Sequence, residues 1–455
     1  MITDKRIVEG LVLKTEAPPK AIALSPAHKG VILPGTSYNL PLVPPIFSQH
    51  ILFSGGIGSG KTNAINHIVK QLIEKRTAND VVVIFDSKGD FLRTFGPRLP
   101  DKAVISNDQN ANVTWNMFNE ALIDYAKYGV QSLDESLMEL SNNLFQTIIE
   151  KDVNNPFFPL AAKNIFYGLL KYLATEKLSD HLSKGKSLIT NKSIYELSKL
   201  DSSRIVDLFN SPAHQKDLGQ LVYYLGKMKK DKTGTMGFVE NDQGASVIAT
   251  LRNVLIDIFK GKFAKEGNFS IRDFVRKKGG RFLFVEYDLS QGRVLAPIYK
   301  VMIDMAIKEA LCRDRSRGNV FFIIDEFRLL PKLDFMDAGV NLGRGLGAKF
   351  IVGIQNLKQI DAIYGEAEAR SILSGFVTNI NFRTTDLETR EYIKSLSGDQ
   401  IYEYTVKSLS GGMQRERTTA VTDENILKLE VGEAIINIPV LDKNPIQFQF
   451  KEFKG

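Results

Sequence analysis

One segment restricts the possible fold more than any other, a glycine-rich run with the spacing G-x-x-x-x-G-K-T. It consists of Gly55, Gly56, Ile57, Gly58, Ser59, Gly60, Lys61 and Thr62. The apolar stretch 51–53 precedes it, and apolar residues at helical spacing follow it over 65–73. Glycines in this pattern let backbone N–H groups turn toward a polyphosphate, and a following helix directs its positive end at the same anion. The sequence therefore predicts a strand, a phosphate-binding loop and a helix.

Two side chains of this loop have predicted chemical roles. Lys61 is expected to reach the β- and γ-phosphates of a nucleotide, and the Thr62 hydroxyl is expected to ligate Mg²⁺. A GTP-specific site requires an Asn-Lys-x-Asp motif, but the pair Asn191-Lys192 continues with Ser193-Ile194. We therefore expect ATP and Mg²⁺ as the cofactors, bound by the whole loop 55–62.

A second group of polar residues lies far along the chain, where two apolar runs end. Asp325 and Glu326 directly follow 320–324, and Gln355 follows 350–354. The carboxyl ends of parallel strands meet at one edge of a sheet, so these side chains should lie near the phosphate-binding loop. Asp325 is predicted to hold Mg²⁺ through water, Glu326 to polarise the attacking water, and Gln355 to sense the γ-phosphate or orient that water. This set favours hydrolysis over nucleotide storage.

Short apolar runs recur along the chain and indicate a buried parallel sheet. They lie at 51–53, 81–85, 282–285, 320–324, 350–354, 377–382 and 434–438. Runs that are apolar on both faces are typical of a parallel sheet with helices on each side. Amphipathic helical patterns lie between several of them, and such alternation is typical of an α/β fold with a mainly parallel, doubly wound sheet.

The stretch 119–246 breaks this alternation. It shows no convincing buried strand and has helical patterns at 133–149, 161–173 and 193–200. We predict an all-α domain inserted between the second and third strands of the sheet. The nucleotide-binding domain then comprises 46–118 and 247–455, and the proline-containing segment 1–45 is a lead-in with one or two edge strands.

The composition excludes several other classes of protein. With one cysteine, Cys312, and five scattered histidines, the sequence offers no disulfide framework and no metal-ligand cluster. No apolar run approaches the roughly 18 residues that a membrane span needs, and the start of the chain lacks a signal-peptide pattern. We therefore expect a cytoplasmic protein. The net charge of +7 is compatible with an anionic partner, and the basic clusters 227–232, 276–278 and 313–317 are interpreted singly as solvated surface runs.

Taken together, these motifs resemble the type IV secretion coupling proteins of the TrwB/TraD kind, within the HerA/FtsK superfamily of P-loop ATPases. The segment Phe-Asp-Ser-Lys-Gly-Asp-Phe at 85–91 is similar to the family's Asp-Pro-Lys-Gly-Asp, with Ser87 in place of the proline. Further family-like segments follow in family order at 115–118, 244–251, 269–274, 343–344, 353–356 and 363–365. The resemblance covers about residues 46 to 452.

The resemblance implies a RecA-like domain that carries the inserted helical domain. It also implies a homo-hexameric ring with ATP at the subunit interfaces and DNA in the central channel. An arginine from the neighbouring subunit would then neutralise charge in the transition state, and Arg344 and Arg383 are both candidates. Asp86 and Lys88, at the end of another strand, are candidates for the active site or the interface.

The implied DNA translocase would grip the phosphate backbone, so binding should be largely independent of sequence and sensitive to salt. The basic, glycine-containing stretch 227–237 is a candidate DNA contact, although a solvated loop is the alternative. Tyr223 and Tyr224 are candidates for stacking on bases, and packing in the core is their alternative. Whether the DNA is single- or double-stranded, and in which direction it moves, stays open.

Coupling proteins of this group usually begin with transmembrane helices, whereas this sequence shows no integral membrane segment. One hypothesis is that a membrane-anchor, secretion or relaxase partner recruits the protein to the inner membrane. A second is a soluble HerA-like motor that serves DNA processing or defence with an effector. A third is a nucleotide-gated assembly scaffold, but Glu326 argues against it because a scaffold needs no catalytic base.

Overall fold

The computed structural model describes residues 2–19, 21, 30–47, 49–152, 155–183, 188–230, 236–312, 318–406 and 413–455. The predicted basic cluster 313–317 therefore lies outside the described residues, as do the last two residues of 227–232. The chain divides into two compact units. The first comprises Met1–Lys102, Lys278–Leu283 and Ala310–Gly455, and the second comprises Ala103–Lys277 and Phe284–Glu309.

The largest sheet has nine strands in the order β16-β15-β12-β4-β11-β10-β5-β9-β6. The strands are β4 (Ile51–Ser54), β5 (Val81–Asp86), β6 (Ala103–Ile105), β9 (Arg281–Glu286), β10 (Val320–Ile324), β11 (Ala348–Ile354), β12 (Thr378–Phe382), β15 (Glu433–Asn437) and β16 (Ile446–Gln449). Each of the predicted apolar runs is a strand of this sheet, which confirms the α/β class. The sequence did not predict β6, which is very short, or β16, in which buried and half-buried residues alternate.

The parallel register brings the ends of five strands to one edge. Ile324 of β10 lies level with Phe85 of β5, and Ile354 of β11 lies level with Ser54 of β4. β12 pairs with the other side of β4 in the same direction. The segments that follow these strands therefore start side by side, as expected for a ligand site at the carboxyl edge of a parallel sheet.

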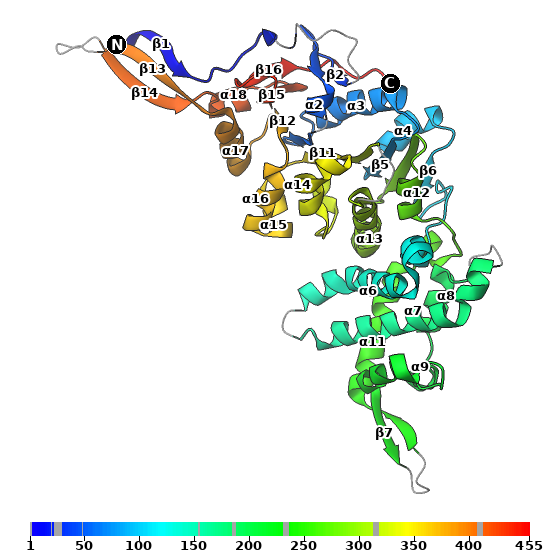
Figure 1. The fold of residues 1–455 in the computed structure, drawn as a ribbon. Coiled ribbons are helices and arrows are strands. Elements are labelled where there is room, and N and C mark those ends of the chain that lie inside the picture. The colour runs from blue at the N-terminus through cyan, green and yellow to red at the C-terminus, as the bar shows by residue number, and fades with distance from the viewer. Residues whose placement is uncertain are drawn as a thin grey trace. The chain divides into compact units, whose positions relative to one another are not determined.

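Helices cover both faces of the sheet in the first unit (Figure 1). α3 (Lys61–Lys75) connects β4 to β5 and buries Ile65, Ile68, Val69 and Leu72, as its spacing predicts. α14 (Met336–Leu346) connects β10 to β11 in the opposite direction across the sheet, and α15 (Lys358–Tyr364) and α16 (Glu366–Ser374) follow β11. Because parallel crossovers are right-handed, opposite directions place the helices on opposite faces.

The described part of the first unit contains four further helices. They are α2 (Pro44–Phe47), α4 (Asp90–Phe95), α17 (Leu387–Ser397) and α18 (Asp423–Leu427), with the 3₁₀ turns η1 (Gly96–Arg98) and η5 (Phe327–Leu329). Only the acidic pair separates the end of β10 from η5, so this turn holds the chain at the carboxyl edge of the sheet immediately after Glu326.

The described strands near the N-terminus lie outside the nine-stranded sheet, and β1 is an edge strand of a smaller one. β2 (Val31–Leu33) and β3 (Leu40–Leu42) pair only with each other. β1 (Ile2–Gly10) pairs with β13 (Asp399–Val406), which pairs with β14 (Met413–Thr419), in a separate antiparallel sheet (Figure 1). Lys14, between β1 and β2, forms an isolated parallel bridge with Ile446 of β16.

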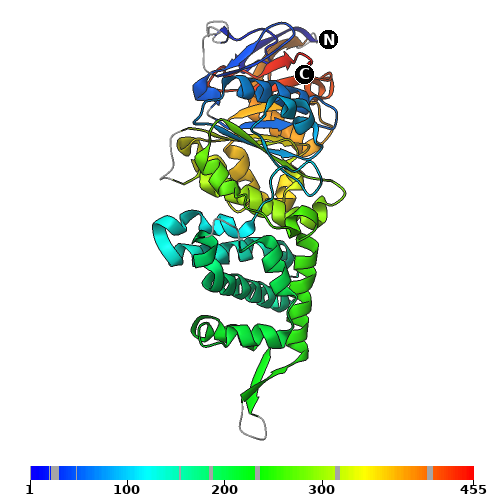
Figure 2. The same ribbon diagram turned by 90° about the vertical axis from the view of Figure 1, so that its right-hand side faces the viewer.

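The second unit is mainly helical. Its helices are α5 (Met117–Ala121), α6 (Tyr125–Lys151), α7 (Phe157–Ser183), α8 (Asn191–Ser198), α9 (Ser202–Phe209), α10 (Gln215–Leu218), α11 (Asp242–Ile258), α12 (Ile271–Lys277) and α13 (Gly292–Ala310), with the 3₁₀ turns η2 (Leu122–Asp124), η3 (Gly219–Tyr224) and η4 (Gly261–Ala264). α6 packs on α7, and α11 runs alongside α7, α8 and α9 (Figure 2). Within the described ranges, no helix has both the length and the apolar character that a membrane span requires.

The segment 119–246 is not wholly helical, in contrast to the prediction. β7 (Gly226–Lys230) and β8 (Met236–Glu240) form an antiparallel hairpin that projects from the helices of this unit (Figure 1). The compact unit also extends beyond 119–246, because α11 packs on the helices before it. The division into a nucleotide-binding and an inserted domain stays a prediction.

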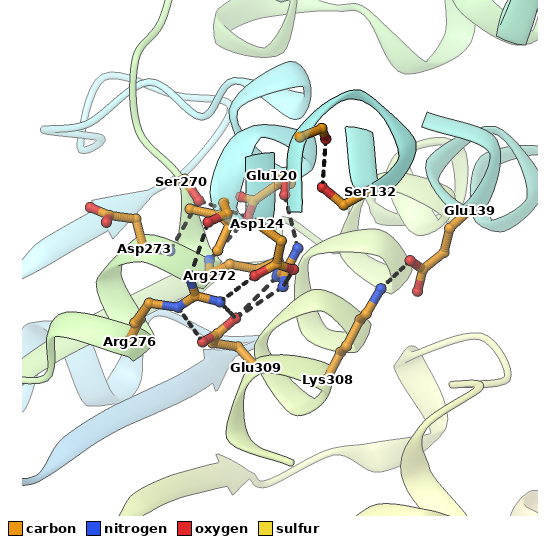
Figure 3. A network of polar contacts seen from close by, with 12 residues as sticks. Glu120, Asp124, Ser132, Glu139, Ser270, Arg272, Asp273, Arg276, Lys308 and Glu309 are labelled. Carbon is orange, nitrogen blue, oxygen red and sulfur yellow. Dashed lines mark hydrogen bonds and ion pairs between the residues drawn. The ribbon is translucent and has the colours of Figure 1, made fainter. Parts of the chain in front are cut away.

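A buried polar network holds the beginning of the helical segment against α12 and α13 (Figure 3). The fully buried carboxylate of Glu120 accepts hydrogen bonds from Trp115 Nε1 (2.8 Å) and from the Ser270 hydroxyl (2.8 Å). It also accepts from the backbone N–H groups of Ile271 (2.7 Å) and Arg272 (3.0 Å). Four donors replace the water that this carboxylate loses on burial, which is what a buried charge requires.

Candidate nucleotide-binding site

The phosphate-binding loop follows β4 and ends where α3 begins, as predicted. Gly60 has a φ of 114°, in the region that favours glycine, and a Cβ at this position would lie 2.8 Å from the Cα of Gly432. The close approach of these two segments therefore requires a glycine. Since Gly60 precedes α3 and offers no side chain as a cap, the N–H groups of the first turn can receive an anion.

Lys61 is folded back onto the loop. Its Nζ donates to the carbonyl oxygens of Gly55 (2.6 Å) and Gly56 (2.9 Å). Burial lowers the pKa of Lys61, and the negative charges of Asp325 and Glu326 oppose part of that shift. The ammonium group thus lies in the loop that would hold the phosphates, and it would exchange two carbonyl oxygens for phosphate oxygens on binding.

Thr62 and Asp325 form a preassembled pair of cation ligands. The Thr62 hydroxyl donates to Asp325 Oδ2 over 2.7 Å. Asp325 Oδ1 is buried and has no hydrogen-bond partner among the described residues. Burial raises the pKa of this carboxyl, while Thr62 and the charges of two lysines lower it. A hydroxyl beside a carboxylate with an unsatisfied buried oxygen is a donor set that fits Mg²⁺.

Glu326 lies beside this pair with both carboxylate oxygens engaged. Gln355 Nε2 donates to Glu326 Oε2 over 2.6 Å, so the two predicted residues are brought together. Arg328 Nε donates to Glu326 Oε1 over 3.0 Å, a contact that the sequence did not predict. The close approach of β11 depends on Gly353, where a Cβ would lie 2.3 Å from the carbonyl oxygen of Asp325.

Of the two candidates at the end of β5, Asp86 is engaged by the turn that follows, and Lys88 acts on the site through its charge. The carboxylate of Asp86 accepts from the backbone N–H of Leu92 over 2.8 Å, so it holds the turn that leads into α4. The exposed Lys88 is close enough for its charge to contribute to lowering the pKa of both Asp325 and Lys61. Lys88 is thus a second cation at this edge.

The two candidate arginines lie in different places. The carbonyl oxygen of Arg383 accepts from Gly56 N–H over 2.9 Å, so Arg383 borders the phosphate-binding loop of its own chain, with an exposed side chain. Arg344 is exposed in the last turn of α14, which leads into the start of β11. Burial above all, and to a smaller extent Arg344, lowers the pKa of His50 to about 4. Because His50 precedes β4, Arg344 lies toward the opposite edge of the sheet. A role of either arginine in a neighbouring subunit stays a prediction.

A phosphate-binding loop between strand and helix, with an acidic pair at the end of a nearby parallel strand, defines a P-loop nucleoside-triphosphatase fold. The sequence matches the family described as "Type IV secretion-system coupling protein DNA-binding domain" at residues 36–200 and 174–441. The chain therefore belongs to the type IV secretion-system coupling protein family, as the resemblance of its motifs predicted.

Among curated relatives, the coupling protein TraD of Escherichia coli (strain K12) is 24% identical over 420 residues, which cover 88% of this chain and 52% of TraD. The chain thus spans about half the length of TraD. Among solved structures, the unbound conjugative coupling protein TrwBΔN70 matches with a TM-score of 0.72 and 18% identity over 99% of this chain and 94% of that one. TrwB in complex with ADP and Mg²⁺ matches with a TM-score of 0.69 and 19% identity, over 99% and 95%. These likenesses confirm the predicted fold.

Proposed function

We propose that the chain is an ATPase that binds ATP and Mg²⁺ through the loop 55–62 and uses hydrolysis to move DNA. The observation that carries this proposal is the cluster at one sheet edge in which Thr62 contacts Asp325 and Glu326 contacts Gln355. Membership of the coupling protein family supports it, and so does the complex of TrwB with ADP and Mg²⁺.

In the proposed reaction, the loop N–H groups and Lys61 bind the β- and γ-phosphates. Thr62 and Asp325 would hold Mg²⁺, which would supply positive charge against the phosphate oxygens. Glu326 accepts a proton from water as the water oxygen bonds to the γ-phosphorus, the bond from phosphorus to the bridging oxygen breaks, and ADP leaves with that oxygen. The amide of Gln355 orients the water from the strand beside Glu326.

The β7–β8 hairpin is the surface that we propose for DNA contact. Lys227, Lys229 and Lys230 are all exposed on β7. Tyr223, just before the hairpin, is 76% exposed and is therefore available to stack on a base. Tyr224 instead accepts a hydrogen bond from Asn164 over 3.0 Å and packs within the helical unit. Lysines on a projecting hairpin suit contact with phosphates rather than recognition of bases.

For the assembly, we propose a ring of six copies with Arg344 or Arg383 acting on the nucleotide of a neighbour. Membership of the family supports a place in a type IV secretion system, with a secretion, relaxase or membrane-anchor protein as partner. A HerA-like DNA-processing motor with an effector is the second candidate. Native mass measured with and without ATP and DNA tests the ring, and a mass that stays at one copy under every condition contradicts it.

Stimulation of ATP hydrolysis by DNA tests the proposed function. We expect steady-state hydrolysis by the purified chain to rise on addition of single- or double-stranded DNA, most strongly at low salt. Lys61→Ala should lose this activity because the β- and γ-phosphates lose their cation. Lys70→Ala, on the same helix, is the control and should behave as the wild type. Hydrolysis that DNA never changes would favour a partner-activated ATPase or a nucleotide-gated scaffold.

Replacement of the three hairpin lysines by alanine is expected to weaken DNA binding uniformly across sequences. Each phosphate contact contributes about 0.9 to the slope of log K against log salt, so the slope should fall by roughly 3. The control variant replaces Lys192, Lys199 and Lys260 by alanine. It removes the same number of positive charges, but these lysines already pair with carboxylates. Fluorescence anisotropy over a salt series gives both slopes. If both variants lose the same DNA affinity and the same salt dependence, net charge and not the hairpin governs binding.

A further inference from the structure

Arg328 is in contact with the candidate catalytic base and has no role in the proposed reaction. It lies on η5, two residues after Glu326, and its Nε donates to Glu326 Oε1 over 3.0 Å. Gln355 holds the other oxygen over 2.6 Å. The carboxylate of Glu326 therefore accepts one hydrogen bond from a neutral amide and one from a cation.

The two partners of this ion pair differ in exposure. The side chain of Glu326 is 9% exposed, whereas that of Arg328 is 45% exposed. Among the described residues, Glu326 is the only hydrogen-bond or ion-pair partner of Arg328, and the bond uses Nε alone. The terminal amino groups of the guanidinium are thus left for another anion, and a phosphate suits them because it can accept two parallel N–H bonds.

The contact has a consequence for catalysis. To accept a proton from the attacking water, Glu326 must direct an oxygen at that water within hydrogen-bond distance. In this structure Oε1 is directed at Arg328 and Oε2 at Gln355. Gln355 is a predicted partner of the same water, so its bond is compatible with catalysis. The bond from Arg328 takes one of the two lone pairs of Oε1 and fixes the direction of this oxygen, so Oε1 serves the water best once that bond is lost or rearranged.

We propose that Arg328 restrains the catalytic base in the DNA-free protein. It holds Glu326 away from the attacking water until a competing anion binds the guanidinium in place of Glu326. This inference rests on the proposed function, which supplies the competing anions as phosphates of bound DNA. Arg328 is a positioning residue, since it acts through Glu326 and not on the nucleotide.

Arg328→Ala tests the restraint. The DNA-free kcat should rise about fivefold, which corresponds to ~1 kcal/mol for a half-exposed ion pair. The KM for ATP should stay within about twofold, since only the transition state gains from a free base. The rate with saturating DNA should stay near that of the wild type, so the factor of stimulation shrinks. Arg328→Lys keeps a cation near Glu326 and should give an intermediate DNA-free rate.

Two further variants and a check of folding make the result specific. Arg328→Ala combined with Glu326→Gln should return to background, because the gain acts through Glu326. Arg370→Ala removes an exposed arginine that pairs with Glu366 within α16, and should leave both rates unchanged. The melting temperature of each variant checks that the fold survives. A DNA-free rate of Arg328→Ala that is unchanged or lowered, in a wild type that hydrolyses ATP, overturns the restraint alone. If ATP hydrolysis stays at background in the wild type and in both Lys61→Ala and Arg328→Ala, the proposed function is overturned together with the restraint.

Discussion

Glu326→Gln is expected to lower the rate of ATP hydrolysis by about 10²–10⁴-fold, the usual contribution of a general base. The side chain keeps its shape, although its single acceptor oxygen can keep only one of the bonds that Arg328 and Gln355 now donate. An amide cannot accept a proton from water. The site that binds the nucleotide is untouched, since Lys61, Thr62 and Asp325 contact the loop and each other rather than Glu326. ATP affinity should therefore stay within a few-fold of wild type.

Two measurements separate these effects. Binding of a fluorescent ATP analogue gives the affinity, and a single-turnover experiment with excess enzyme gives the chemical step. Glu368→Gln, at a surface carboxylate that pairs with Lys332 in the same unit, is the matched control and should hydrolyse ATP normally. Retained hydrolysis by Glu326→Gln would show that another group activates the water. Loss of ATP binding would show that Glu326 helps to build the site and would leave its role as base without support.

The phosphate-binding loop and its acidic partners were predictable because each rests on a local pattern and on one general rule of parallel sheets. The runs before Gly55, Asp325 and Gln355 are strongly apolar, so their strands were evident. The rule that parallel strands end at one edge then placed the side chains together. The contact between Glu326 and Gln355 confirms their proximity, whereas their chemical roles stay predictions.

Other features could not be predicted because their cause is not local. The strands of the β7–β8 hairpin, GKMKK and MGFVE, lack an apolar run, and exposed lysines are equally typical of a loop. Arg328 belongs to no motif, and its role depends on the turn of η5 that brings it back to Glu326. Glu120 is a charged residue whose four donors include three residues of 270–272, so only the tertiary fold explains its burial. Arg344 was also hard to place, because a basic residue at the end of a helix gives no indication of which sheet edge it lies near.

Arg272→Met should destabilise the protein by about 3–5 kcal/mol, the usual cost of breaking a buried ion pair from one side. The side chain of Arg272 is 3% exposed, and it bridges Asp124 (2.6 Å) and the carboxylate of Glu309, which is 1% exposed (Figure 3). Its Nη1 also donates to the carbonyl oxygen of Glu120 over 3.1 Å. Methionine fills similar space but offers no donor. Asp124 and Glu309 would keep only their bonds from Arg276, and the buried carboxylate of Glu309 would gain no water in exchange.

The second arginine of the network provides the matched control. Arg276 binds the same two carboxylates, with Nε 2.6 Å from Glu309 Oε1 and Nη2 2.8 Å from Asp124 Oδ1, but its side chain is 34% exposed. Water can replace part of what Arg276→Met removes, so we expect a loss of only about 1 kcal/mol. Urea unfolding of both variants gives the two free energies of unfolding. Equal losses would show that burial does not set the cost.

A double variant distinguishes the charge from the packing. Adding Glu309→Gln to Arg272→Met removes a buried carboxylate that the single change leaves with less positive charge around it. If the unpaired charge dominates the cost, the double variant should be more stable than the sum of the two single losses predicts, by about 1–3 kcal/mol. Strict additivity would mean that the two side chains contribute independently, through packing with their other neighbours, and that the network joins α12 to α13 by shape rather than by charge.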